Sequence, residues 1–192
     1  MSSESSERDI VVAAAVESYD RARLAHRVVL SPEQVEERLL SDNPEGTVTV
    51  DTAMRILEDA IARASNLNAD DLIKGKDWEE ERGKTYIMYD NVSKQVYQLQ
   101  NERKNLKNNE SELDNMIRSQ HKLMNRYIML RDNIIKYKKI LLQIKDNILG
   151  EVINFKNNIS SSTTANDILR ESYKLTYPME VMERIIKNMD TD

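Results

Sequence analysis

The sequence predicts an all-α protein, in which a small N-terminal helical module precedes a long coiled-coil or helical-hairpin segment and a short C-terminal docking helix. Two observations predict this class. Apolar or aromatic side chains recur at steps of seven across residues 84–159, and a helix with such a stripe must turn it toward another helix to keep it dry. In addition, 32% of the 192 residues are charged, whereas only four are Gly and three are Pro, a composition typical of long helices.

The long helical segment, residues 84–159, carries the main interaction hypothesis. We define its interaction seam as the apolar residues at helical steps of three, four and seven, namely Val92, Leu99, Leu106, Leu113, Leu123, Tyr127, Leu130, Ile134, Leu141, Ile144, Ile148 and Phe155. A further apolar row at Ile128, Ile135, Leu142 and Leu149 makes this face wider than a two-stranded coiled coil needs. We therefore expect a trimer, a tetramer, or a bundle with another part of the chain.

The regular pattern is interrupted twice in this segment, once near its middle and once by consecutive steps of four at Ile144, Ile148 and Val152. Consecutive steps of three at Glu110, Leu113 and Met116 lie beside the polar run 107–111, where Ser111 or Asp114 could cap a new helix. Two alternatives follow: one continuous helical rod, or two helices that fold back as a hairpin.

The N-terminal module, residues 1–73, is acidic and helical, with 15 Asp and Glu residues against seven Arg. Ser31, Pro32 and Gln34 form a helix-start signature, which predicts a helix from Pro32 to about Leu40. A first helix is predicted from about Glu7 to Val28, and a third is predicted to follow the one at Pro32, with Asp51 as its N-cap residue.

The stretch between these two helices, residues 41–52, resembles a degenerate EF-hand calcium-binding loop. Oxygen-bearing side chains stand at loop places one, three and five, and Gly46 stands at place six. Ser41 replaces the first carboxylate, Pro44 stiffens the turn, and Thr52 replaces the bidentate Glu at place twelve. These departures favour a plain connection between helices over a calcium site.

The C-terminal part divides into a predicted flexible linker, residues 160–166, and short helices in residues 167–192. Tyr177-Pro178 is predicted to end one helix and begin another, because the residue before a proline avoids helical geometry. The last helix carries an apolar face of Met182, Ile185, Ile186 and Met189. So short a helix must dock, either on the bundle of its own chain or in the groove of a partner.

Basic side chains concentrate in residues 118–145, where Asp132 is the single acid before Lys145. We name the following residues the basic face: Arg118, Lys122, Arg126, Arg131, Lys136, Lys138, Lys139 and Lys145. They suit charged flanks of a helical seam, an acidic protein partner or the acidic N-terminal module, and phosphate groups of nucleic acid or lipid.

Catalytic and cofactor chemistry finds little support in the sequence. The chain has no Cys, which excludes disulfides, thiolate catalysis and Cys-based metal sites. Its two histidines, His26 and His121, lie far apart, and no zinc-protease or nucleophile-elbow motif is present. We expect no enzyme, no cofactor and no metal. The longest apolar run has seven residues, so we expect no transmembrane segment and a soluble intracellular protein.

The sequence thus predicts a non-enzymatic structural scaffold or adaptor, which self-associates or binds partner proteins through the interaction seam. The alternative function is nucleic-acid binding through the basic face, residues 118–145.

Overall fold

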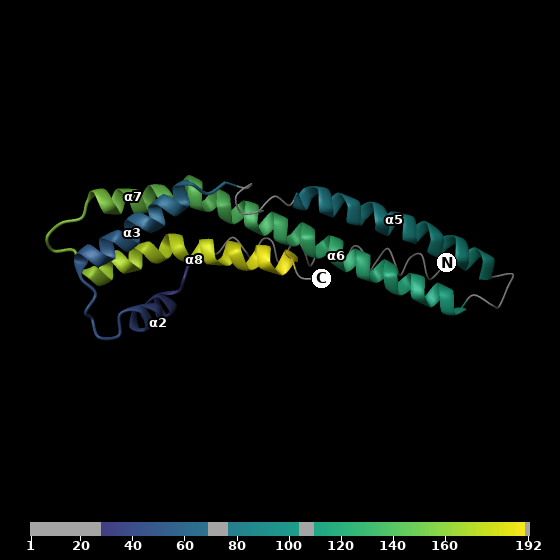
Figure 1. The fold of residues 1–192 in the computed structure, drawn as a ribbon, viewed down its shortest axis with the longest axis horizontal. Coiled ribbons are helices and arrows are strands. Elements are labelled where there is room, and N and C mark those ends of the chain that lie inside the picture. The colour runs from purple at the N-terminus through teal and green to yellow at the C-terminus, as the bar shows by residue number, and fades with distance from the viewer. Residues whose placement is uncertain (1–27, 69–76, 104–109, 191–192) are drawn as a thin grey trace. The chain divides into compact units, whose positions relative to one another are not determined.

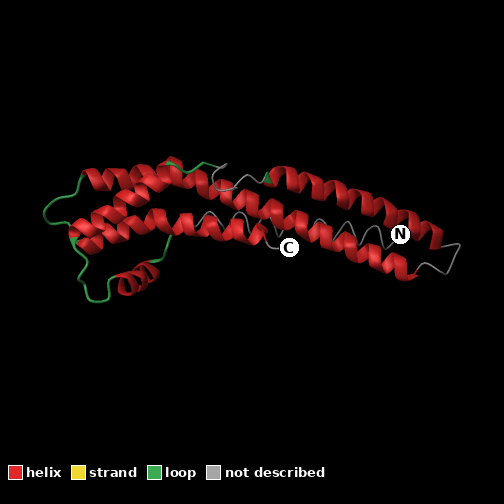
Figure 2. Cartoon of the chain, viewed as in Figure 1, coloured by secondary structure: helices red, strands yellow, loops and turns green. Residues whose placement is uncertain are grey.

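The structure, a computed structural model, describes residues 28–68, 77–103 and 110–190. The predicted first helix, from about Glu7 to Val28, lies outside these ranges except for its last residue. Within these ranges every regular element is a helix, so the predicted all-α class is confirmed (Figure 1, Figure 2). The elements are α2 (Pro32–Asp42), α3 (Val50–Ser65), α5 (Trp78–Arg103), α6 (Glu110–Gln143), the π-helix η1 (Ile144–Ile148), α7 (Leu149–Asn157) and α8 (Ala165–Asp190). None of the helices in these ranges is both long enough and apolar enough to cross a membrane.

The chain separates into two compact units, and the division falls within α6 after Ile135. The described part of the first unit is α5 with residues 110–135 of α6. The described part of the second unit contains α2, α3, residues 136–143 of α6, η1, α7 and α8. The predicted segment 84–159 therefore contributes to both units.

The first unit is an antiparallel helix pair. Its cross-contacts join Ser93 Oγ to Gln120 Nε2 at 3.0 Å and the rings of Tyr86 and Tyr127, whose centroids lie 5.5 Å apart. Residue numbers fall along α5 as they rise along α6, which defines the antiparallel orientation. These antiparallel contacts between α5 and α6 agree with the hairpin alternative and not with one continuous rod.

The second unit is built around α8, which contacts α2, α3, η1 and α7. Its contact with α3 is the most extensive, and the two helices lie side by side in Figure 1. The buried face of α3 consists of Leu57 and three alanines, Ala53, Ala60 and Ala64. Small side chains at this spacing let the two helix backbones approach closely, so that Leu57 is fully buried.

Helix starts follow local capping chemistry. The predicted capping box of α2 is confirmed, since Ser31 and Gln34 exchange side-chain and backbone hydrogen bonds. The predicted cap of α3, Asp51, is wrong. Thr49 is the N-cap, with extended backbone angles and a side-chain oxygen that accepts from the Thr52 amide, so Asp51 instead lies in the first turn.

The predicted helix break at Tyr177-Pro178 is also wrong, because α8 runs unbroken from Ala165 to Asp190 with Pro178 inside it. A proline inside a helix removes one backbone hydrogen bond and costs about 3 kcal/mol. Here Pro178 is buried, and so are Leu175 and Met179 on either side. Packing of this continuous apolar face against the rest of the unit offsets the local cost.

The loop that resembles an EF-hand is a hydrogen-bonded connection between α2 and α3. The side chain of Asn43, at loop place three, is buried and hydrogen-bonded at both ends: its oxygen accepts from the Val48 amide, and its nitrogen donates to Asn166 of α8. Gly46 adopts a left-handed conformation with φ of 65°, which favours glycine at this turn. Asn43 thus fastens the loop to α8.

Candidate functional site

The interaction seam lies mostly inside the two units. Leu113, Leu130, Ile134 and Ile144 are buried, and Val92, Leu99, Leu123, Tyr127, Leu141, Ile148 and Phe155 are half-buried. Leu106 lies outside the described residues. The seam therefore packs within the chain to a large extent, and the side chains most open to solvent belong to other positions. Leu142 of the additional apolar row is 59% exposed.

Three exposed large apolar side chains of α5 are consecutive in sequence, and a fourth, Tyr97, lies further along the helix. Tyr86, Ile87 and Met88 are 51%, 61% and 54% exposed. The neighbouring charges on this helix are paired with one another, since Lys84 contacts Glu80 at 3.0 Å and Arg82 contacts Glu79 at 2.9 Å. We call the three apolar residues the α5 patch. It is an apolar surface on an electrostatically balanced helix, and the sequence search for a seam did not single it out.

The basic face is divided between the two units and between several environments. Arg118 and Lys122 in the first unit and Lys138 and Lys145 in the second are exposed, whereas Arg126, Arg131, Lys136 and Lys139 are half-buried. Arg126 lies 3.8 Å from Glu81 of α5. Part of the predicted basic face thus contributes to packing within the hairpin.

The predicted docking helix is the C-terminal half of α8. Met182, Ile185, Ile186 and Met189 are all buried within the chain. Met182 also borders a hollow beside the C-terminal end of α3. Of the two alternatives for this helix, the structure shows packing within the chain.

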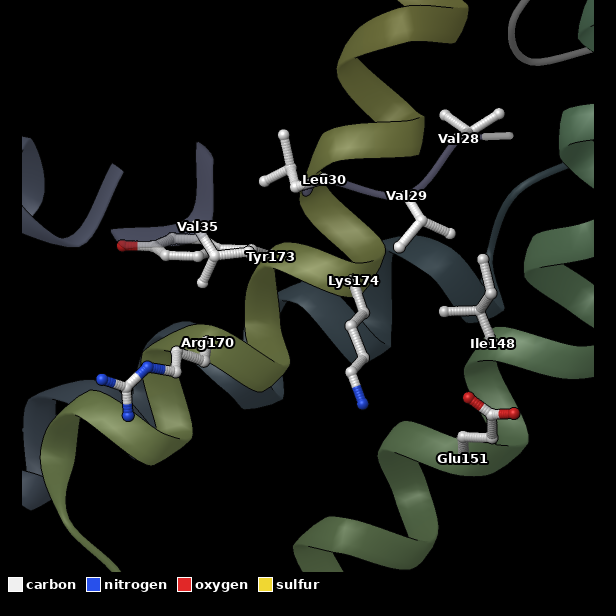
Figure 3. Close-up of a pocket in the computed structure, with 9 residues that line it drawn as sticks. All are labelled: Val28, Val29, Leu30, Val35, Ile148, Glu151, Arg170, Tyr173 and Lys174. Carbon is white, nitrogen blue, oxygen red and sulfur yellow. The ribbon is translucent and has the colours of Figure 1, made fainter. Parts of the chain in front are cut away.

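A mainly apolar cavity of about 340 Å³, partly open to solvent, lies beside α8, and we call it the α8 cavity (Figure 3). Its apolar walls come from four places in the chain: the segment before α2, the first turns of α2, the end of η1, and α8. These walls are formed by Val28, Val29, Leu30, Val35, Ile148 and the ring of Tyr173. Three charged side chains complete the lining: Glu151, Arg170 and Lys174.

The two cationic side chains at this cavity already have carboxylate partners. Arg170 donates to Glu36 at 3.0 Å and to Asp167 at 3.1 Å, and Lys174 lies 3.0 Å from the largely buried carboxylate of Glu171. The side chain of Glu151, in contrast, is exposed and has no ion pair or hydrogen bond within the described ranges. Figure 3 shows it across the cavity from Arg170, on the side that η1 and α7 provide.

The Tyr173 wall of the cavity is fixed by a polar cluster that joins α2 to α8. The Tyr173 hydroxyl donates to Asp42 at 2.8 Å, the Arg38 guanidinium lies 4.9 Å from the Tyr173 ring centroid, and Arg38 also donates to Glu180 at 3.1 Å. Burial, followed by the bond to Asp42, raises the pKa of Tyr173 well above its ordinary value of 10.0. The hydrogen bond to Glu180 is the main cause that raises the pKa of Arg38. The phenol is therefore neutral and the guanidinium charged at all physiological pH values.

The described residues contain no group of three or more acidic or histidine side chains placed to hold a metal ion. His121 is exposed on α6, and His26 lies outside the described residues. Sequence reasoning did not find the α8 cavity, because its walls are contributed by residues up to 145 positions apart that share no motif.

Comparison of the chain with protein-family models, with curated proteins and with solved structures finds no match.

Proposed function

We propose that this chain is a non-enzymatic helical scaffold or adaptor that associates with a second copy of itself, and through the same surface with partner proteins. The observation that carries the proposal is the α5 patch. Tyr86, Ile87 and Met88 are each at least half exposed, although they are consecutive large apolar residues on a regular helix. Because successive helical residues point about 100° apart, a helix from a second copy would cover part of this run; the apolar surface that it covers leaves water at about 25 cal/mol for each Å².

The charges around the patch support an apolar contact rather than an ionic one. Lys84, Arg82 and Lys94 each pair with an acidic residue one turn earlier on α5. A partner surface therefore meets a locally balanced helix, and the apolar side chains supply most of the favourable free energy.

The test is a mass measurement on the full chain and on two double variants. Ile87→Lys with Met88→Glu replaces the patch by opposite charges, and light scattering after size exclusion gives the mass at several concentrations. We expect the wild-type mass to exceed 22.3 kDa and to fall on dilution. We expect the dissociation constant of the variant to be at least about tenfold higher, because two apolar side chains leave the interface.

The matched control is Gln95→Lys with Gln98→Glu, which makes the same charge changes at exposed polar positions of the same helix. The control should associate like the wild type. Equal masses for all three proteins at every concentration contradict a contact through the α5 patch.

Nucleic-acid binding is the second candidate, and the exposed part of the basic face favours it. Arg118 and Lys122 are exposed one helical turn apart on α6. If they hold phosphates, affinity for duplex DNA or RNA falls steeply with salt, and Arg118→Glu with Lys122→Glu reduces both the affinity and the salt dependence. Lys84→Glu is the control, since it removes an exposed cation from α5 that is paired with Glu80. Salt-independent affinity, or an equal loss in the control, excludes this candidate.

A further inference from the structure

The α8 cavity has the size and walls of a site for a small apolar molecule. Its volume of about 340 Å³ lies at the lower end of the range of ligand sites, roughly 300–1,000 Å³. Val35 and Ile148 face the cavity from α2 and from η1, and the ring of Tyr173 closes a third side (Figure 3). A compact body such as one aromatic ring with a short chain matches these walls.

The charged residues at the cavity favour a positively charged molecule over a negatively charged one. The lining residues and their ion-pair partners comprise two cations and four carboxylates. Arg170 pairs with Glu36 and Asp167, Lys174 pairs with Glu171, and the fourth carboxylate is Glu151. An anionic ligand would have to share Arg170 or Lys174 with a carboxylate of the chain itself. A cationic ligand meets Glu151, whose side chain has no partner in the described part of the chain.

The wall that carries Glu151 is also unusual in its backbone. Residues 144–148 form a π-helical turn between α6 and α7, and Ile148, its last residue, lines the cavity. Such turns are rare and are frequent at functional sites, because they rotate the following side chains relative to a regular helix. Here the turn precedes Glu151 by one helical turn and so sets the direction from which its carboxylate approaches the cavity.

We infer that the α8 cavity binds a small apolar molecule with one positive charge, of the arylalkyl primary amine class. The aromatic body lies against Val35, Ile148 and Tyr173, and the ammonium group lies at Glu151. This site is separate from the α5 patch, and its test is independent of self-association.

Three probes with the same aromatic body distinguish charge from apolar fit: 2-phenylethylammonium, 3-phenylpropionate and ethylbenzene. Each is titrated into the isotopically labelled full chain, and amide shifts in NMR spectra report both the affinity and the position. We expect the ammonium probe to shift the amides of Val35, Ile148 and Tyr173. We expect it to bind about five- to tenfold more tightly than the carboxylate, with ethylbenzene in between.

Glu151→Gln tests the charged contact. The variant should weaken the ammonium probe about two- to fivefold, as for a solvent-accessible ion pair, and should leave ethylbenzene unchanged. Asp146→Asn is the matched control, because it removes the same charge from an exposed position of η1 that does not line the cavity. It should leave all three probes unchanged.

Val35→Trp tests the location by filling the cavity from α2. It should abolish binding of every probe while circular dichroism remains that of the wild type. Ile148→Phe fills the cavity from the opposite wall and serves if the first variant alters the fold. The inference is overturned by a preference for the carboxylate, by no binding of any probe, by equal effects of Glu151→Gln and Asp146→Asn, or by binding that survives filling.

Discussion

The hydrogen bond between Gln120 and Ser93 in the hairpin predicts two variants with opposite effects on stability. Gln120 is 4% exposed, and its Nε2 donates to Ser93 Oγ at 3.0 Å. Its Oε1 is buried without a hydrogen-bond partner in the described residues. Ser93 has a second bond, because its hydroxyl donates to the Tyr89 carbonyl at 2.8 Å.

Ser93→Ala removes the acceptor of the buried amide. The Gln120 side chain then has no partner at either end, and an unsatisfied buried polar group costs about 1–3 kcal/mol, so the free energy of unfolding should fall by that amount. Gln120→Leu removes the amide itself and leaves Ser93 with its bond to Tyr89. No polar group loses its last partner, and the unsatisfied Gln120 Oε1 is removed. The free energy of unfolding should therefore rise by about 1 kcal/mol.

Urea unfolding followed by far-ultraviolet circular dichroism measures both changes in the free energy of unfolding. The dependence of that free energy on urea concentration should be the same in all variants. The double variant Ser93→Ala with Gln120→Leu should be as stable as Gln120→Leu alone, because Ser93→Ala destabilises the chain only by removing the hydrogen-bond acceptor of the Gln120 amide. If Gln120→Leu destabilises the chain as much as Ser93→Ala does, the amide contributes net stability and this reasoning is refuted.

Three further predictions concern the second unit. Leu57→Ala should lower the free energy of unfolding by about 2–5 kcal/mol, because Leu57 is fully buried between α3 and α8, whereas Ile56→Ala at a 40% exposed position should change it by less than about 1 kcal/mol; urea unfolding compares them. Pro178→Ala should raise the thermal midpoint, because a backbone donor returns to the interior of α8; an unchanged or lower midpoint means that the buried ring contributes more than the missing bond costs. Bonds from the Thr164 backbone and hydroxyl hold the pKa of Asp167 below its ordinary value of 3.8, so its stabilising effect is present above that value and is lost as pH falls through the lowered pKa. The stability difference between wild type and Asp167→Asn should therefore be larger at about pH 6 than at about pH 3, and a difference that grows in acid contradicts this sign.

The parts of the fold that depend on neighbours in sequence could be predicted from sequence. The capping box at Ser31 involves residues three apart and was therefore predictable, whereas the interrupted seven-residue pattern left both a continuous rod and a hairpin open. The expectation that a helix ends before proline failed at Pro178. There, burial against distant elements outweighs the cost of a proline inside a helix, about 3 kcal/mol.

The candidate sites could not be predicted for a related reason. The α8 cavity exists because Val28, Ile148 and Tyr173 meet in the folded unit, and nothing in their local patterns marks this meeting. The α5 patch could not be predicted because the sequence does not show which apolar side chains stay exposed. Ile87 and Val92 are both apolar residues of one helix, yet packing leaves Ile87 61% exposed and Val92 half-buried. Periodicity names the residues that can form a seam, but only the packed structure shows which surface remains open.

Site-specific photo-crosslinking from position 87 tests the proposed association through α5 most directly. A photoreactive amino acid replaces Ile87 in the full chain, and in a control chain it replaces Glu45, which is exposed in the turn between α2 and α3. Illumination in dilute solution should join two chains into a covalent dimer, twice the 22.3 kDa chain mass, from position 87 and not from position 45. A product that stays at the mass of one chain from position 87, or equal dimer yields from both positions, would contradict an association surface on α5.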